Sequence, residues 1–93
     1  MTTFEQMARV IIEEQRLIIG PLAWNEASKV QGLRIINQST SEVQILGDQK
    51  QVIDRLVAQY ERLFGRASHE VCKEATASIR ATMQLLEVPA SLR

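Results

Sequence analysis

The sequence has little cysteine, proline, glycine or aromatic side chain. Its 93 residues include one cysteine, two prolines, four glycines, two phenylalanines, one tryptophan and one tyrosine. The lone cysteine, Cys72, cannot form an internal disulfide, whereas small proteins of oxidising compartments usually contain several. We therefore expect a reducing environment and a core held together by aliphatic side chains.

An excess of either charge is also missing. Eleven lysine and arginine residues balance eleven aspartate and glutamate residues, and no run of like charge stands out. Sequence-independent nucleic-acid binding draws its affinity mainly from Lys and Arg contacts to phosphate. We expect no nucleic-acid partner, unless folding assembles a basic patch from distant residues.

Long apolar runs are absent as well. The longest, such as Val10–Ile12 and Leu17–Ile19, fall far short of the ~20 residues that cross a membrane as a helix. The first residues, Met1-Thr2-Thr3, lack the basic region that begins a signal peptide. We expect no membrane association and a cytoplasmic location.

What the sequence does contain is enough apolar material for one core. Apolar residues make up 45% of the chain, and 93 residues are too few for two self-supporting cores. We predict a single domain over residues 1–93, ordered from about residue 3 to about residue 88, with a frayed tail at 89–93.

The first helix is predicted over residues 4–19, where Thr3 and Gln6 have the spacing of a capping box. At about 100° per residue, one broad face of this helix is apolar. The residues on that face are Phe4, Met7, Ala8, Ile11, Ile12, Ile18 and Ile19. Gly20 ends the helix, and Pro21 is suited to begin a second one over residues 21–31.

Two short segments rich in β-branched residues follow, at 33–36 and 43–46, with a polar stretch between them. Alternate residues in each segment can face a common core. These residues are Leu33, Ile35, Val43 and Ile45. The pattern predicts a β-hairpin, which must pack on the helices to be stable.

Two more helices are predicted after Gly47. Asp48 and Gln51 repeat the capping spacing, and Gly65 ends this third helix. Ser68 is expected to cap the fourth helix, which ends before Pro89. The third apolar stripe is Val52, Ile53, Leu56, Val57, Tyr60, Leu63 and Phe64, and the fourth is Val71, Cys72, Ala75, Ile79, Met83 and Leu86. The predicted fold class is α+β, mainly α, with four helices and one hairpin in the order ααββαα.

Side chains able to perform chemistry are few. His69 and Cys72 lie one turn apart, and a Cys–His pair is the minimum for activating a thiolate. We interpret Cys72 as a core thiol and His69 as a surface imidazole, because Cys72 falls on the apolar stripe. Two ligands are also too few for a structural zinc site. The paired acids fall on solvated helix faces: Glu13 with Glu14, and Glu70 with Glu74. We predict no catalytic, cofactor-binding or metal-binding residue, and no enzyme.

Three apolar residues remain after the helix faces, caps and turns are assigned. Val10 and Leu17 lie seven residues apart and form a second strip, off the main face of the first helix. Trp24 lies among small residues, where another chain can approach closely. Each also has a purely structural interpretation: the first helix packs on two sides, and Trp24 fills the core. Gln15, in the middle of the main face, either bonds to the hairpin backbone or marks an open end of that face.

The segment Ile19-Gly20-Pro21-Leu22-Ala23, followed by Glu26-Ala27 and Val30, resembles the G-P-[I/L]-A helix start of certain small helical modules. Those modules are attached to bacterial serine/threonine kinases and to response-regulator-type proteins. The resemblance is confined to this stretch. It implies a bacterial, signalling-associated interaction module, and it carries over no catalytic residue.

The function we predict is a non-catalytic protein-interaction or regulatory module, with Val10, Leu17 and Trp24 as interaction candidates. Its partner is another protein, or a second copy in a homodimer formed through the first helix. The alternative is a small-molecule sensor with a pocket between the hairpin and the helices. Neither function requires a cofactor.

Overall fold

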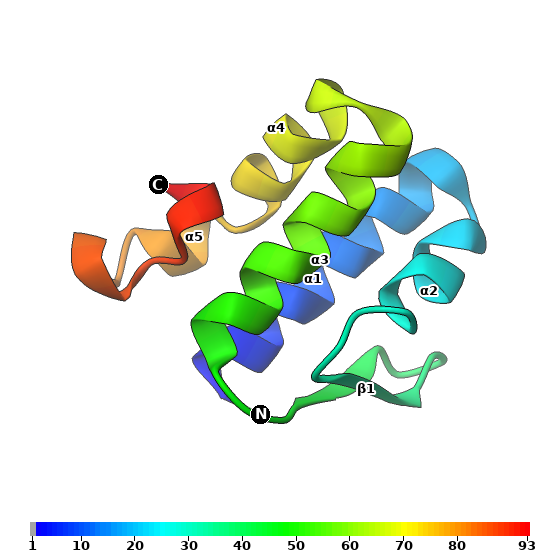
Figure 1. Cartoon of the computed structure of the whole chain (residues 1–93), viewed down its shortest axis with the longest axis horizontal. Coiled ribbons are helices and arrows are strands. Elements are labelled where there is room, and N and C mark those ends of the chain that lie inside the picture. Colours follow the sequence, from blue (N-terminus) through cyan, green and yellow to red (C-terminus); the bar gives the residue numbers. More distant parts are fainter. Residues whose placement is uncertain (1) are drawn as a thin grey trace.

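Five α-helices, a two-stranded antiparallel hairpin and two 3-10 helices make up residues 2–93, the part of the chain that the computed structural model describes (Figure 1). Helices α1 (Thr3–Ile19) and α2 (Leu22–Ala27) precede the hairpin of β1 (Leu33–Asn37) and β2 (Glu42–Ile45). Helices α3 (Gln49–Phe64), α4 (Arg66–Ala75) and α5 (Ala77–Arg80) follow it. The order of helices, hairpin and helices confirms the predicted mainly helical α+β fold, with five α-helices in place of four.

Helix α1 begins one residue earlier than predicted. The Thr2 hydroxyl accepts a hydrogen bond from the Glu5 N–H at 3.1 Å, and Glu5 Oε1 accepts one from the Thr2 N–H at 3.0 Å. This capping box replaces the expected pair of Thr3 and Gln6. The buried residues of α1 are Met7, Ala8, Ile11, Ile12 and Gln15. Ile18 was expected on the same face but is 63% exposed, because it lies at the edge of that face, beside a groove against α4.

Helix α2 is shorter than the predicted 21–31. The Ser28 hydroxyl donates to the Asn25 carbonyl at 2.7 Å, and the Val30 N–H donates to the Ala27 carbonyl, so the chain tightens into turns. Hydroxyl groups that bond the local backbone in this way compete with helix continuation.

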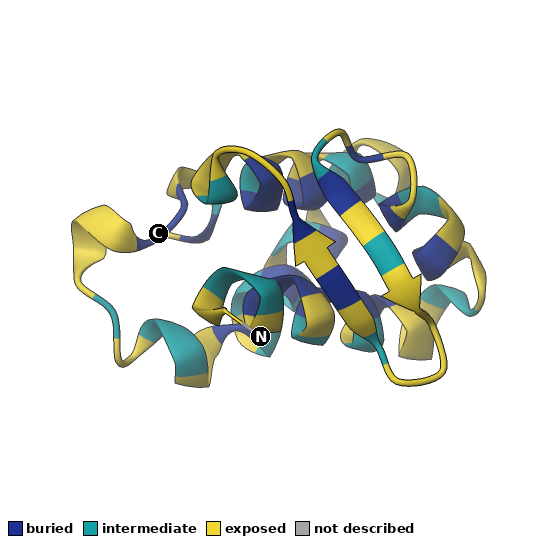
Figure 2. Ribbon diagram, turned by 90° about the horizontal axis from the view of Figure 1, so that it is seen from below, coloured by how far each residue is buried: buried dark blue, intermediate teal, exposed yellow. Residues whose placement is uncertain are grey.

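The hairpin follows the predicted alternation. Leu33 pairs with Ile45, and Ile35 pairs with Val43. Leu33, Val43 and Ile45 are buried and Ile35 is half-buried, so both strands alternate between the core and solvent (Figure 2). A carboxylate of α1 holds the hairpin in place, because Glu5 Oε2 accepts a hydrogen bond from the Ile45 N–H at 3.0 Å.

Helix α3 supplies the centre of the core. Asp48 caps its first turn by accepting from the Gln51 N–H at 3.0 Å, as predicted. Its buried residues are Val52, Ile53, Leu56, Val57 and Tyr60. The predicted stripe is wrong at Leu63, which is exposed, whereas the next residue, Phe64, is half-buried and packs against the core.

The predicted fourth helix is divided. Helix α4 begins at Arg66, directly after Gly65, so Ser68 lies inside it and does not cap it. It ends at Ala75 because the Thr76 hydroxyl donates to the Cys72 carbonyl at 2.9 Å. Arg80 then donates to the Lys73 carbonyl at 2.6 Å, which satisfies another end group of the helix. Leu86, expected on the stripe, is 76% exposed.

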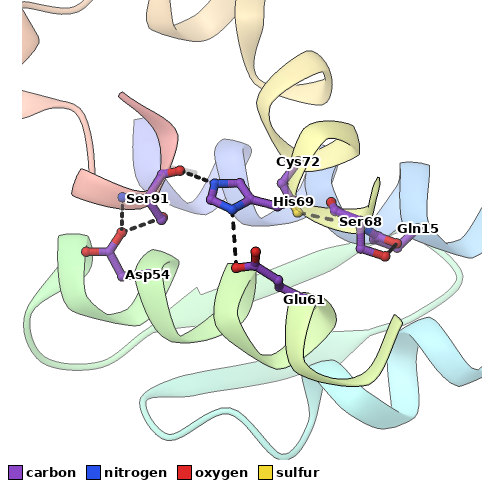
Figure 3. Close-up of polar contacts among 7 residues, drawn as sticks. All are labelled: Gln15, Asp54, Glu61, Ser68, His69, Cys72 and Ser91. Atoms are coloured by element: carbon purple, nitrogen blue, oxygen red, sulfur yellow. Dashed lines mark hydrogen bonds and ion pairs between the residues drawn. The ribbon is translucent and has the colours of Figure 1, made fainter. Parts of the chain in front are cut away.

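The expectation of a frayed tail at 89–93 is wrong. Two 3-10 helices, Leu85–Glu87 and Ala90–Leu92, bring the chain end back against α3. Val88, Pro89 and Leu92 are buried, and Asp54 Oδ1 accepts hydrogen bonds from the N–H and the hydroxyl of Ser91 (Figure 3). Apolar contacts and a carboxylate of α3 together hold this segment.

Candidate functional site

The thiol of Cys72 is fully buried between α1 and α4. Gln15 Nε2 donates to Cys72 Sγ at 3.5 Å and to the Ser68 carbonyl at 3.0 Å (Figure 3). Burial raises the pKa of the Cys72 thiol to about 11. The thiol is therefore protonated at neutral pH, which is the inert form of a structural cysteine.

His69 is not the surface imidazole that the sequence suggested. Its Nδ1 lies 3.2 Å from Glu61 Oε1, and its Nε2 is in hydrogen-bonding contact with the carbonyl oxygen of Ser91 (Figure 3). The ring thus joins α4 to α3 and to the C-terminal segment, and its exposure falls because that segment packs on it. Both ring nitrogens face oxygen atoms, and neither is hydrogen-bonded to Cys72.

Gln15 is the buried polar group of the α1 face. It bonds to α4 and is fully buried, so neither alternative holds: Gln15 does not bond to the hairpin backbone, and the face is closed at this point. The bond from α1 to the hairpin is instead made by Glu5, whose carboxylate accepts the N–H groups of Thr2 and Ile45. Those two bonds lower the pKa of the Glu5 carboxyl.

No group of three or more His, Cys, Asp or Glu side chains within residues 2–93 is placed to hold a metal ion. Glu13 forms an ion pair with Arg9 at 2.8 Å, whereas Glu14, Glu70 and Glu74 are exposed. No helix within the same range is long and apolar enough to span a membrane.

The three interaction candidates do not come together. Leu17 is 69% exposed and Val10 is partly exposed on α1, whereas Trp24 on α2 is only 4% exposed and belongs to the core. Trp24 is covered because α2 packs against both α1 and α3. The structure therefore leaves Leu17, with Val10 at its side, as the open part of the predicted set.

An open groove of about 380 Å³ lies between α1 and α4, and it is lined by Ile18, the residue that follows Leu17. We name this feature the α1–α4 groove. Ile18 from α1 and Val71 and Ala75 from α4 form its apolar part. The carboxylates of Glu14 on α1 and Glu74 on α4 line it as well. The site is therefore a trough of mixed polar and apolar lining, with an acid on each of its two helices.

Sequence reasoning missed this groove, because it assigned Ile18, Val71 and Ala75 to the core. The row of α4 that faces the core is Ser68 and Cys72, continued by Thr76, and the predicted stripe contained only Cys72 of these. Hydropathy alone favours the wrong row, because two members of the buried row carry hydroxyl groups. The polar Gln15 on the α1 face was the available signal, since a buried amide needs polar partners across the interface.

A second hollow, of about 400 Å³, lies between the α1–α2 turn and the hairpin loop. We name it the hairpin–helix pocket. Its lining residues are Arg16, Gly20, Pro21, Trp24, Gln38, Ser39 and Ser41. Arg16 is the one charged side chain among them. The hollow lies where the sensor interpretation placed a ligand.

The chain matches no protein-family model, no curated protein and no solved structure. The resemblance to the kinase-associated and response-regulator-associated modules therefore stays a prediction. Gly20 and Pro21 also have a local role. Gly20, at φ 70°, ends α1 by donating to the Arg16 carbonyl at 2.9 Å, and Pro21 directly precedes α2.

Proposed function

We propose that this protein is a non-catalytic protein-interaction module with a regulatory role, and that it docks a partner on the α1–α4 groove and the adjoining Leu17. One observation carries the proposal. Leu17 and Ile18 are consecutive large apolar residues on a 17-residue helix, and they are 69% and 63% exposed. Covering them with a partner contributes up to about 2 kcal/mol of binding free energy each.

Two exposed leucines elsewhere do not form an equivalent surface. Leu85 and Leu86 are 67% and 76% exposed, but they lie on a three-residue 3-10 helix. Ile18, by contrast, lines a groove whose walls are two packed helices, and Leu17 precedes it on the same helix. Preformed walls favour binding, because less conformational entropy is lost when the partner docks.

The state of the reactive side chains supports a non-catalytic role. Cys72 is buried and protonated, and both ring nitrogens of His69 face structural oxygen atoms. An association with signalling rests on the resemblance of Gly20-Pro21-Leu22-Ala23 alone. The occupant of the groove is either a second copy, through the first helix, or a different protein.

A comparison of two surface variants tests whether Leu17 and Ile18 bind a partner or stabilise the fold. Peptides selected from a random library against the wild-type protein are expected to lose binding to a Leu17→Ser/Ile18→Ser variant. They should keep their affinity for a Leu85→Ser/Leu86→Ser control, which removes an equally exposed apolar pair. Both variants should unfold within about 1 kcal/mol of wild type, since exposed substitutions cost little.

The opposite pattern would contradict the proposal. Selected peptides that bind the Leu17→Ser/Ile18→Ser variant as tightly as wild type would place the docking surface elsewhere. A loss of more than about 2 kcal/mol of unfolding free energy in that variant would assign Leu17 and Ile18 to the core.

A small-molecule sensor is the second candidate, and the hairpin–helix pocket favours it. Trp24 lines that pocket and is the protein's one tryptophan. A ligand in the pocket should therefore change the tryptophan fluorescence. A screen of small anions and neutral fragments that leaves the emission unchanged at saturating concentrations would count against this function.

A further inference from the structure

We infer that the α1–α4 groove binds a cationic amphipathic helix of another protein, and does not bind a second copy of this chain. The inference rests on the proposed function and specifies its partner. A trough between two helices that combines apolar side chains with acids suits an amphipathic helix, whose apolar face contacts Ile18, Val71 and Ala75 while its polar residues meet the carboxylates. The residues at the borders of the groove decide which polar residues the partner must carry.

The borders of the groove are acidic. Glu14 and Glu74 contribute a carboxylate from each helix, and both residues are exposed. Within residues 2–93 neither forms an ion pair, whereas Glu13 is bound by Arg9 and Glu26 by Lys29. No basic side chain lines the groove. A helix with Lys or Arg beside its apolar face supplies the missing charge on both sides.

Self-association through α1 is disfavoured by the same acids. In a two-fold dimer with antiparallel α1 helices, the strip of Val10 and Leu17 packs against the same strip of the other copy, so Val10 of each copy would lie against Leu17 of the other. The centre of such a contact falls between Glu13 and Glu14, which brings four carboxylates together. Arg9 offsets the charge of Glu13 within each chain. Glu14 remains without a partner, and Arg16 is turned away into the hairpin–helix pocket.

The experiment uses three synthetic helical peptides of about 18 residues, or five turns. All three carry the same Leu/Ala face, and their polar faces carry Lys, Gln or Glu. Binding to the full chain is followed by amide chemical shifts of Ile18, Val71 and Ala75. The Lys peptide should bind about threefold to tenfold tighter than the Gln peptide, because two exposed ion pairs form, and the Glu peptide should bind weakest. At about 1 M salt, where the Debye length is about 3 Å, the three affinities should converge.

Two charge-reversal variants sharpen the test. Glu14→Lys/Glu74→Lys should reverse the order, so that the Glu peptide binds tightest. The control Glu42→Lys/Glu87→Lys changes the net charge equally at exposed acids that do not line the groove, and it should keep the wild-type order.

The outcomes distinguish this inference from the proposed function. If the three peptides bind with equal affinity and shift the amide signals of the groove, the cationic character of the partner is contradicted and the docking surface is retained. Absence of groove shifts with every peptide overturns both. Concentration-dependent dimerisation that is lost in the Leu17→Ser/Ile18→Ser variant overturns the choice of another protein over a second copy.

Discussion

At the scale of single residues, Gly32 is the position most restricted by its neighbours. It lies between α2 and β1 at φ 90°, in the left-handed region that favours glycine. A Cβ atom there would lie 2.7 Å from Val52 Cγ2 and 2.8 Å from the Leu46 carbonyl oxygen. Gly47 has a similar φ of 96°, but a Cβ atom at that position meets nothing within 4 Å. Comparing the two positions therefore separates the effect of backbone strain from the effect of crowding by neighbouring atoms.

We predict that Gly32→Ala destabilises the protein more than Gly47→Ala. Each variant pays about 1 kcal/mol for a left-handed alanine. Gly32→Ala loses about 1–3 kcal/mol more, because β2 and α3 must shift to admit the methyl group. Urea denaturation of both variants measures the difference in unfolding free energy. Equal losses would show that Val52 and Leu46 give way freely.

Some residue roles were readable from the sequence, and others were not. Asp48 was identified as a cap because its partner, Gln51, is three residues away. The role of Glu5 depends on Ile45, which is 40 positions distant. His69 likewise gains its partners from α3 and from the chain end. A local pattern contains no information on such contacts.

At the scale of elements, the carboxylate of Glu5 couples the first turn of α1 to the hairpin. The Thr2 N–H and the Ile45 N–H donate to it, in that order of importance, and lower its pKa from the ordinary 4.5. A carboxyl group with a lowered folded-state pKa adds stability above its unfolded-state pKa. That stability is lost as the pH falls through the folded-state pKa.

We predict that Glu5→Gln removes part of the acid sensitivity of folding. Near neutral pH the variant should unfold about 1 kcal/mol more easily than wild type, a typical capping contribution. This difference in unfolding free energy should disappear as the pH falls below about 4.5, because wild type then loses the charged form of Glu5. Thermal unfolding of both proteins over this range gives the comparison. The control is Glu70→Gln, at an exposed acid, whose unfolding free energy should equal that of wild type at every pH.

The C-terminal segment is the element whose packing the sequence concealed. Leu92 is fully buried against the core, whereas Leu86, six residues earlier, is exposed. We predict that Leu92→Ala lowers the unfolding free energy by about 2–5 kcal/mol, because it leaves a cavity. Leu86→Ala should change it by less than about 0.5 kcal/mol. Chemical denaturation measures both, and a neutral Leu92→Ala would mean that the chain end does not pack in solution.

At the scale of the whole molecule, the Cα radius of gyration is 11.7 Å, close to the ~12 Å expected for a compact chain of this length. Figures 1 and 2 show how this compactness arises: α1 and α3 pack together, the hairpin covers one end, and the last residues return to α3. Within residues 2–93 no buried side-chain nitrogen or oxygen lacks a hydrogen bond. The buried polar side chains are therefore all paired, and Leu17 and Ile18 lie outside the buried core.

Periodicity, capping and turn chemistry act over a few residues, so the sequence alone determined the fold class, the hairpin and the buried face of α3. The tertiary structure decided which row of α4 is buried, where α4 ends and how the chain terminus docks. It also covered Trp24 and left Ile18 exposed. These outcomes depend on contacts between segments far apart in the chain, such as Gln15 with Ser68 and Asp54 with Ser91. Shape and hydrogen-bond partners, which hydropathy does not record, determine such contacts.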